Sequence, residues 1–316
     1  MSCLYFGIDM GGTKCAVLVA DKDGNILERR AFATGRDCMP DDVIGQCICI
    51  MEDYRKLYED DERKLSSIGV SCGGPLDSAA GIIMAPPNLP NWIDYPIVEI
   101  IGKHFGVPCN LENDANACAL AEWKFGAAKG TRNAVFLTFG TGLGAGLIID
   151  GRLYSGTNGN AGEVGHVRLT DDGPVGFYKA GSFEGWCSGG GIRENALIEM
   201  NRNVGRDSVL YSLDEINAKT VFNAADEGDI LAQEIVDSTA YQLGMGLSMI
   251  IDILNPEVIV IGSIYARSEW QLKPIMEKVI AREALSKSSA VCRVLPAALG
   301  NGIGDYAAIS IAMEER

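Results

Sequence analysis

The sequence predicts an α/β fold that is divided into two domains. Strand-like apolar runs alternate with helix-like amphipathic runs, a pattern typical of α/β layers. The length of 316 residues and the hydrophobic content of 47% allow a large core and favour two domains. A unit of strand, glycine-rich turn, strand and Asp-Gly turn also occurs twice, around Asp9–Gly24 and around Thr138–Gly151.

The first 125 residues are expected to form strands and three helices. Residues 4–33 contain three strand-like segments, which predict a three-strand meander. Val43, Cys47 and Tyr54 share the helical spacing of apolar residues that predicts a helix over 41–58. The remaining predicted elements of this region are strands over 65–71, 81–84 and 108–112 and helices over 98–105 and 115–125.

The rest of the chain is expected to add a second set of strands and helices. A strand over 134–138 precedes the second glycine-rich turn, and residues 304–315 form a closing helix. The other predicted elements are helices over 192–201, 230–254 and 270–285 and strands over 258–263 and 291–295. We expect a small N-terminal α/β domain over 1–114 plus 301–316 and a large C-terminal α/β domain over 115–300.

Both glycine-rich turns carry residue types that bind phosphate. Their glycines can adopt positive φ and let a bulky phosphate approach the backbone amides. Thr13 and Thr141 add hydroxyl donors, and Lys14 adds a positive charge. Asp9 places a carboxylate where a Mg²⁺ ion that bridges two phosphates would sit, through water. Two such turns that face each other would hold a nucleoside triphosphate between two lobes, and the alternative is two ordinary tight hairpins.

Neither turn matches the two most familiar nucleotide-binding loops. A Walker P-loop has Gly-Lys-Ser/Thr at the start of a helix, whereas a strand-like run follows Gly12-Thr13-Lys14. Gly140, Gly142 and Ala145 match the G-x-G-x-x-A pattern of dinucleotide-binding folds. Residues 146–151 indicate a strand and a turn, however, where that fold requires a helix. Both alternatives are therefore excluded.

The charge and the cysteines exclude further classes of protein. A formal charge of −15 and a pI of about 4.6 disfavour binding to DNA or to an anionic membrane. The ten cysteines are scattered and form no C-x-x-C pair, so we expect reduced thiols, a cytoplasmic protein and no cysteine zinc cage. No apolar run is long enough to span a bilayer, and the N-terminus lacks the basic region of a signal peptide.

Asn113 and Asp114 lie at a predicted junction between a strand and a helix. In open α/β sheets, ligands bind at the carboxyl ends of strands. Asp114 is therefore a candidate general base for a hydroxyl nucleophile. The alternative is helix capping, since Asn and Asp are preferred N-cap residues. Capping needs only one of the two residues, and both roles stay open at this point.

A second polar group lies in glycine-rich sequence after the second turn. His166 follows Glu163, and Glu184 lies in a further glycine-framed segment. Carboxylates and an imidazole between glycines are suited to binding several hydroxyls of one sugar, and buried hydrogen bonds of this kind discriminate strongly between substrates. The alternative is a solvated loop with an incidental histidine. The other histidine, His104, lies in an amphipathic helix and is expected to be structural.

Seven short motifs connect these observations: Asp9–Lys14, Gly73–Pro75, Asn88–Trp92, Glu112–Asn116, Gly140–Gly144, Glu163–His166 and Val260–Ser263. In this order they resemble the ROK family of repressors, open reading frames and sugar kinases, over essentially the whole chain. The resemblance implies the actin-like ATPase (ribonuclease H-like) fold, with two α/β domains around an interdomain cleft. It also implies transfer of the γ-phosphate of ATP, with Mg²⁺, to a hydroxyl of a hexose or amino-hexose.

By matching position, the resemblance implies a role for each candidate residue. Asp114 would be the catalytic base that deprotonates the sugar hydroxyl, and Asp9 would bind Mg²⁺ through water. Gly262 and Ser263 would lie near the adenine. The phosphates would be held by Gly11, Gly12, Thr13, Lys14, Thr141 and Gly142. The sugar would be held by Gly74, Asn88, Asn113, Asp114, Glu163, His166 and Glu184.

The chain departs from the family where most members carry C-x-C-G-x-x-G-C-x-E and bind structural zinc. Counted back from Glu184, the three cysteine positions hold Val175, Phe177 and Ser182. One histidine without thiolates cannot form a closed tetrahedral zinc site. We therefore expect no structural zinc. We also expect the segment to be packed by Val175, Phe177, Tyr178 and Phe183.

Several functions are compatible with this pattern. Glucose, phosphorylated to glucose 6-phosphate, is the leading substrate; N-acetylmannosamine, N-acetylglucosamine, fructose and glucosides are the alternatives. A sugar-sensing repressor is disfavoured because the first motif starts at Asp9, which leaves no room for a winged-helix domain, and because of the negative charge. A non-catalytic sugar-binding protein would lack the base, whereas Asp114 is present. Polyphosphate is a less attractive donor for an acidic protein. We expect a homodimer or homotetramer and no nucleic-acid or membrane partner.

Overall fold

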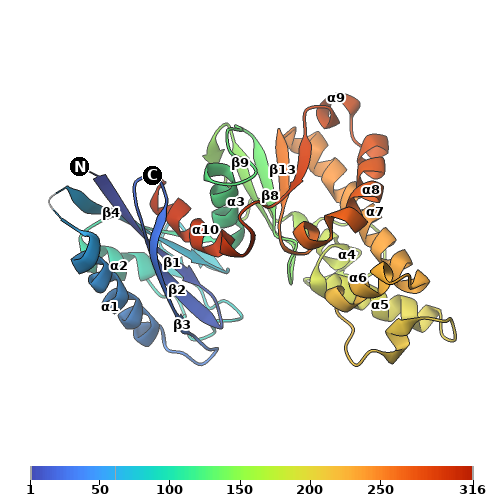
Figure 1. Ribbon diagram of the computed structural model, residues 1–316, viewed down its shortest axis with the longest axis horizontal. Coiled ribbons are helices and arrows are strands. Elements are labelled where there is room, and N and C mark those ends of the chain that lie inside the picture. Colours follow the sequence, from blue (N-terminus) through green and yellow to red (C-terminus); the bar gives the residue numbers. More distant parts are fainter. Residues whose placement is uncertain (1, 61, 315–316) are drawn as a thin grey trace. The chain divides into compact units, whose positions relative to one another are not determined.

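The computed structural model describes residues 2–60 and 62–314, and these form two compact α/β units (Figure 1). Unit 1 contains the residues up to Gly126, Thr157–Gly159 and the residues from Asn301 onward. Unit 2 contains Ala127–Gly156 and Asn160–Gly300. The first boundary falls after Gly126 instead of after Asp114. The reason is that helix α3 (Asp114–Lys124) packs against the C-terminal helix α10 (Ile303–Ala312).

Unit 1 is built on a five-stranded sheet. Its strands are β1 (Ser2–Met10), β2 (Lys14–Ala20), β3 (Ile26–Ala33), β4 (Arg63–Cys72) and β7 (Cys109–Asn113). They lie in the order β3-β2-β1-β4-β7. The first three form the predicted antiparallel meander, and β1, β4 and β7 are parallel neighbours. The carboxyl ends of β1, β4 and β7 therefore meet at one edge of the sheet.

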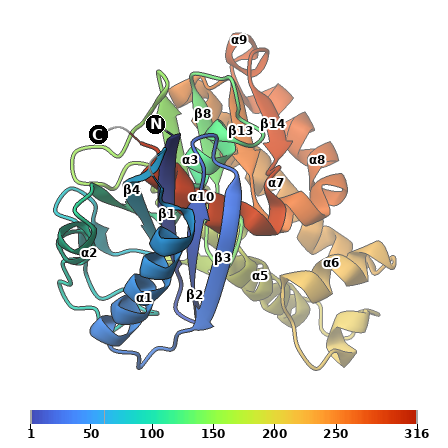
Figure 2. The ribbon, with the colours of Figure 1, turned by 60° about the vertical axis from the view of Figure 1, so that its left-hand side comes forward.

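Helices cover both faces of this sheet (Figures 1 and 2). Helices α1 (Pro40–Tyr58) and α2 (Ile97–Phe105) bury their apolar sides on one face, in a core shared with Phe6. Helix α10 lies on the other face, where Leu18 packs against Ala308 and Ile309. Gly69 of β4 has no side chain, and a Cβ atom at this position would lie only 2.2 Å from the carbonyl oxygen of Ala308. The close packing of α10 on the sheet therefore requires glycine there. The closing helix thus becomes part of unit 1.

Unit 2 repeats the sheet topology of unit 1. Its strands are β8 (Ala134–Leu137), β9 (Ala145–Ile149), β10 (Arg152–Leu153), β13 (Val258–Ile261) and β14 (Arg293–Pro296). Their order is β10-β9-β8-β13-β14, with β8 antiparallel to β9 and parallel to β13. These pairings match those of β1 with β2 and β4. The predicted repeat is confirmed, and it extends from the two hairpins to all five strands of each sheet.

The helices of unit 2 differ from the prediction at several points. They are α4 (Phe183–Trp186), α5 (Gly189–Arg202), α6 (Ala218–Asp226), α7 (Ile230–Leu254), α8 (Ser263–Glu283) and α9 (Ser286–Ser289). Helices α4, α6 and α9 were not predicted, and α5 begins at Gly189 instead of at Ile192. Helix α8 begins at Ser263, which the sequence assigned to the preceding strand, and has a kink at Ser268. The short elements of both units are β5 (Leu76–Asp77), β6 (Ile82–Ile83), β11 (Val175–Gly176), β12 (Lys179–Ala180), η1 (Val164–His166), η2 (Val209–Ser212) and η3 (Gly300–Gly302).

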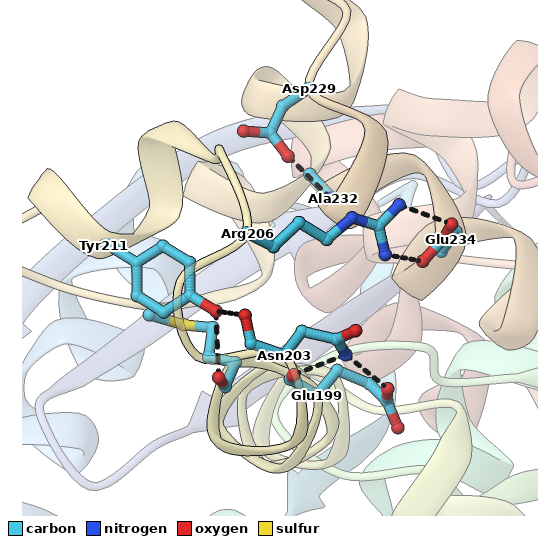
Figure 3. A network of polar contacts seen from close by, with 8 residues as sticks. Glu199, Asn203, Arg206, Tyr211, Asp229, Ala232 and Glu234 are labelled. Atoms are coloured by element: carbon cyan, nitrogen blue, oxygen red, sulfur yellow. Dashed lines mark hydrogen bonds and ion pairs between the residues drawn. The ribbon is translucent and has the colours of Figure 1, made fainter.

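Polar contacts fix the loop that leads from α5 to α6 (Figure 3). Arg206 makes a two-point ion pair with Glu234 of α7, at 2.6 and 2.7 Å. The Tyr211 hydroxyl donates a hydrogen bond to the carbonyl oxygen of Asn203 at 2.7 Å. Asp229 caps α7 by accepting a hydrogen bond from the Ala232 amide at 2.9 Å. The contacts of Arg206 and Tyr211 therefore tie the loop to α7 and to the end of α5.

No helix in the described part of the chain is long and apolar enough to cross a membrane. The ten cysteines are free thiols. The Sγ atoms of Cys15 and Cys47 lie 3.6 Å apart in the core, which is too far for a disulfide and fits a hydrogen bond between two thiols.

Candidate functional site

The candidate site in unit 1 lies at the carboxyl ends of three parallel strands. In the sheet, Asp9 of β1 is paired with Ser71 of β4, and the last residue of β4, Cys72, is paired with Asn113 of β7. The loop after β4 reaches the same place. A Cβ on Gly73 would lie 3.9 Å from Oδ2 of Asp114. This strand edge is where open α/β sheets bind ligands.

Asp114 is the first residue of α3 and is not its cap. The N-cap is Asn113, whose side chain accepts a hydrogen bond from the Ala115 amide at 2.9 Å. One oxygen of Asp114 accepts from the same amide at 2.9 Å. The side chain is open to solvent, yet the surrounding protein removes much of the water around the carboxylate. This desolvation raises the pKa of Asp114 above its ordinary value.

A buried carboxylate holds the junction that carries Asp114. Glu112 is 2% exposed, and its Oε1 accepts hydrogen bonds from the Asn113 amide and the Asn116 side chain, both at 3.0 Å. The same oxygen accepts from the Ser78 hydroxyl at 3.1 Å. These bonds connect the end of β7, the first turn of α3 and the loop after β4. Asp114 therefore projects from a fixed backbone, as an acid–base group requires.

The first glycine-rich turn is tight because two side chains fill the space next to it. The Gly11 amide donates to the Lys14 carbonyl at 3.0 Å, and the Thr34 hydroxyl donates to the Gly11 carbonyl at 2.8 Å. A Cβ on Gly12 would lie 2.5 Å from Cβ of Asn88. The turn and the loop with Asn88 thus lie in direct contact.

The sequence-based explanation for these glycines is wrong in one respect. None of Gly11, Gly12, Gly140 and Gly142 has a positive φ. Glycine is required at Gly12 because a Cβ would collide with the Cβ of Asn88, not because the backbone is left-handed; a Cβ on Gly142 would displace only the carboxylate end of Glu184.

Asp9 has the environment of a carboxylate that would bind a cation. Burial and the neighbouring Asp305 raise its pKa, and Lys14 and Arg29 offset this in part. A Cβ on Gly304, at the start of α10, would lie 2.6 Å from Oδ2 of Asp9. Within residues 2–60 and 62–314, no cluster of three or more His, Cys, Asp or Glu side chains could hold a metal alone. The neighbouring carboxylate of Asp305 and the burial of Asp9 favour a cation beside Asp9, and a Mg²⁺ ion there would be held mainly by phosphate and water.

In unit 2, the Glu184 side chain is hydrogen-bonded to the backbone of the second glycine-rich turn. Its Oε2 accepts a hydrogen bond from the Leu143 amide at 2.9 Å, and a Cβ on Gly142 would lie 2.8 Å from the same oxygen. The Gly189 amide at the start of α5 donates to the Gly140 carbonyl at 2.7 Å. The predicted phosphate turn is thus connected to a predicted sugar residue on one side and to a helix N-terminus on the other.

Glu163 and His166 lie beside the same turn. The Ala145 amide donates to the Gly162 carbonyl at 3.0 Å, and a Cβ on Gly165 would lie 2.1 Å from the Leu143 carbonyl oxygen. The absence of a side chain at Gly165 therefore allows the segment Glu163–His166 to pack directly against the backbone of the turn. Glu163 and His166 themselves are exposed. Unit 2 thus brings together the predicted residues Thr141, Gly142, Glu163, His166 and Glu184.

A cavity of about 900 Å³ in unit 2 begins at the second glycine-rich turn. Gly140, Thr141 and Ser263 line it, together with residues of α5, α6 and α8 that were not predicted. Gly262 is not part of its lining, because Gly262 is buried against the ring of Phe136. The residues that the sequence analysis missed are Gly189, Gly190, Asn217, Ala218, Lys219, Phe222, Asn223, Ile264, Arg267 and Ser268.

Two signals in the sequence could have identified this cavity. The run Ser188-Gly189-Gly190-Gly191 opens the 14-residue helix α5, with Ser188 as its N-cap. A glycine run at a helix N-terminus is a known way to bind anions. Asn217 and Thr220 form a capping box at the start of α6. Threonine in place of the usual Glu or Gln at the second position made this start difficult to recognise.

The prediction for the segment 175–183 is wrong in most respects. Phe183 is buried, at 1% exposure, and packs in the core of unit 2. Val175, Phe177 and Tyr178 are exposed, at 45%, 74% and 94%, and so do not pack the segment. Hydrogen bonds hold it instead. The Val175 amide donates to Glu194 at 2.9 Å, and the Leu169 amide donates to the Gly181 carbonyl at 2.8 Å.

The absence of structural zinc stays a prediction. Protein that is purified without added metal should contain far less than one zinc ion per chain, because His166 has no thiolate partner in its segment. Elemental analysis by mass spectrometry measures this directly. About one equivalent of zinc that survives dialysis against a chelator would contradict the prediction.

The family model described as "ROK family" matches residues 5–315. A glucokinase from Streptomyces coelicolor is 31% identical over 318 residues, which cover 98% of each chain. A solved ROK family glucokinase from Streptomyces griseus, in complex with glucose and AMPPNP, is 28% identical with a TM-score of 0.74 and covers 98% of this chain and 99% of its own. A ROK family transcriptional regulator, homologous to the E. coli MLC protein, is 25% identical with a TM-score of 0.83 and covers 98% and 77%. The duplicated sheets are those of the actin-like ATPase fold, and the chain belongs to the ROK family.

Proposed function

We propose that this protein is an ATP-dependent hexose kinase and that Asp114 is its general base. The observation that carries the proposal is the position of Asp114. It follows β7 at the shared carboxyl edge of β1, β4 and β7 and lies close enough to Asp9 to raise the pKa of that carboxylate, while the N-cap of α3 is Asn113. Similarity to glucokinases over nearly the full chain supports the same activity.

The nucleotide is assigned to both glycine-rich turns and to the cavity of unit 2. Gly11, Gly12, Thr13 and Lys14 would bind phosphate in unit 1, and Thr141 and Gly142 would bind it in unit 2. Ser263 and the cavity beside it would take the adenosine, since that cavity starts at the turn. When bound, ATP would supply the phosphoryl group, and Asp9 would hold a Mg²⁺ ion that neutralises charge on the phosphates.

The sugar is assigned to the polar residues near Asp114 and near Glu184. Gly74, Asn88 and Asn113 of unit 1 and Glu163, His166 and Glu184 of unit 2 would bind its hydroxyls. Asp114 would accept the proton of the attacking hydroxyl, which makes that oxygen a better nucleophile for in-line transfer. The proton then remains on Asp114 until product is released. Glucose, attacked through its 6-hydroxyl, is our leading substrate.

A coupled assay for ADP release tests the proposal. The purified protein is incubated with ATP, Mg²⁺ and a panel of hexoses and N-acetylhexosamines, with fructose and glucosides included. We expect sugar-dependent ADP formation that is fastest with glucose. A sugar-sensing regulator would bind a sugar in a parallel calorimetric titration and release no ADP with any member of the panel, and this result would refute the kinase.

The rate is expected to depend on the ionisation of Asp114. A base acts in its deprotonated form, and desolvation by the surrounding protein raises the pKa of Asp114 above its ordinary value. kcat/KM should therefore decline as the pH falls through this raised pKa, at a higher pH than an ordinary aspartate would give. A pH profile of kcat/KM measures the effect, with circular dichroism as a check that the protein stays folded. A profile that stays flat down to the ordinary aspartate pKa would contradict it.

A further inference from the structure

Phe177 and Tyr178 form the tip of an exposed β-hairpin. Strands β11 and β12 are paired Val175 to Ala180 and Gly176 to Lys179, so Phe177 and Tyr178 make a two-residue turn. Both have positive φ, 41° and 64°. Such turns favour Asn-Gly, because bulky side chains are strained in the left-handed region. Their exposure of 74% and 94% means that burial does not offset this strain. Stability therefore does not explain why two aromatic residues occupy the turn.

The hairpin stands beside the candidate sugar residues of unit 2. The ring of Phe177 meets the ring of His166 edge-on, with centroids 6.4 Å apart. The Lys179 ammonium donates a hydrogen bond to the carbonyl oxygen of His166 at 2.8 Å. A Cβ on Gly176 would lie 2.8 Å from Cβ of Glu184. The hairpin therefore contacts both the segment of His166 and the start of α4 that carries Glu184.

We propose that Phe177 and Tyr178 form an aromatic platform for the second ring of a glycosylated hexose, so that disaccharides and other glucosides are substrates of this enzyme. The inference rests on the proposed function. A pyranose has an apolar C–H face that packs on an aromatic ring, while its hydroxyls bind neighbouring polar groups such as His166 and Lys179. A hexose held by His166 would place a linked second ring near Phe177.

A protein partner fits this hairpin less well than a sugar does. Stable protein interfaces bury about 800 Å² on each partner, far more than two side chains present. The neighbours of the two rings are also polar: the His166 ring contacts Phe177, and Lys179 is the next residue of the hairpin after Tyr178. Aromatic rings among hydrogen-bonding groups are typical of small-ligand sites, where a few polar groups fix the orientation of the ligand.

The test removes the rings and keeps the hairpin. The double variant Phe177→Asn/Tyr178→Gly has the residues that such a turn prefers, so its melting temperature should not fall. We expect the ratio of kcat/KM for cellobiose or maltose to kcat/KM for glucose to decrease about 10-fold, as for the loss of one stacked ring. Phe177→Trp should retain the ratio. Ile253→Ala, which removes an exposed apolar side chain elsewhere in unit 2, should also retain it.

Calorimetric titration with cellobiose, maltose and glucose separates this proposal from the kinase proposal. A wild-type protein that phosphorylates glucose but binds neither disaccharide would overturn the platform and leave the kinase intact. If the double variant keeps the wild-type ratio of kcat/KM for disaccharide to kcat/KM for glucose, the platform is likewise overturned and the kinase proposal stands. A wild-type protein that phosphorylates no sugar would overturn the kinase, and the platform would then be decided by binding alone. Disaccharide binding that is weakened in the double variant would support the platform. Disaccharide binding that is unchanged in the double variant, or no disaccharide binding by the wild type, would overturn the platform.

Discussion

Asp114→Asn is expected to lower kcat by about 10²–10⁴-fold while sugar affinity stays close to that of the wild type. An amide keeps the size and the hydrogen-bonding geometry of the carboxylate but cannot accept the proton of the sugar hydroxyl. Helix α3 should stay intact, because its cap is Asn113. Steady-state kinetics gives kcat, and calorimetric titration with the sugar gives the affinity.

Stability provides the control for this variant. The folded-state pKa of Asp114 is raised above its unfolded value, so at neutral pH the charged carboxylate opposes folding. That effect grows as pH rises from the unfolded to the folded pKa. Asp114→Asn removes the charge and should therefore be at least as stable as the wild type at neutral pH. Near-wild-type turnover in a folded Asp114→Asn protein would show that Asp114 is not the base.

Gly12→Ala is expected to lower kcat/KM by about 10²-fold for both substrates, because a displacement near 1 Å at reacting groups has effects of this size. The new Cβ would lie 2.5 Å from Cβ of Asn88 and 3.0 Å from its carbonyl oxygen. The Asn88 loop has little freedom to move, since Trp92 is fully buried and its carbonyl accepts a hydrogen bond from the Ala85 amide at 2.7 Å. The phosphate turn must therefore shift. Initial rates are measured with ATP varied at saturating sugar and with sugar varied at saturating ATP. These two series give kcat/KM for each substrate.

Gly45→Ala is the matched control. Gly45 lies within α1, and a Cβ there would meet nothing within 4 Å. The same chemical change should leave the kinetics unaltered and stabilise the helix by up to about 1 kcal/mol. Wild-type kinetics in Gly12→Ala would mean that the turn or the Asn88 loop accommodates the new methyl group without loss of function.

The regular elements could be predicted where local signals agree. Helix α7 was predicted as 230–254, its actual extent, because it is long and amphipathic and is bounded by a capping aspartate and by Asn255 with positive φ. Helix α6 was missed because it is short and rich in alanine and its start signal is unusual. The start of α8 was missed because Gly262 and Ser263 are small residues that indicate a turn after the buried strand, not the start of a helix. These two helices contribute much of the cavity lining, so the cavity was only partly predicted.

The candidate site could be predicted where its residues lie at the ends of parallel strands. Asp9, Gly74 and Asp114 come together because β1, β4 and β7 are neighbours, a consequence of sheet topology. The contacts of Gly12 with Asn88 and of Gly142 with Glu184 join distant segments and have no local signal. The exposure of Phe177 and Tyr178 contradicts the usual rule that aromatic residues are buried. The expectation that these two rings replace the missing zinc site by packing the segment was therefore wrong.

Transfer of label from [γ-³²P]ATP to the sugar tests the central claim most directly. Wild-type protein and Asp114→Asn are incubated with labelled ATP, Mg²⁺ and glucose, and the products are separated and identified by ³¹P NMR. We predict that the wild type places the label on the 6-hydroxyl of glucose and that Asp114→Asn, which still binds glucose, leaves nearly all of it on ATP. Label in inorganic phosphate alone, or equal transfer by both proteins, would contradict a kinase in which Asp114 activates the sugar hydroxyl.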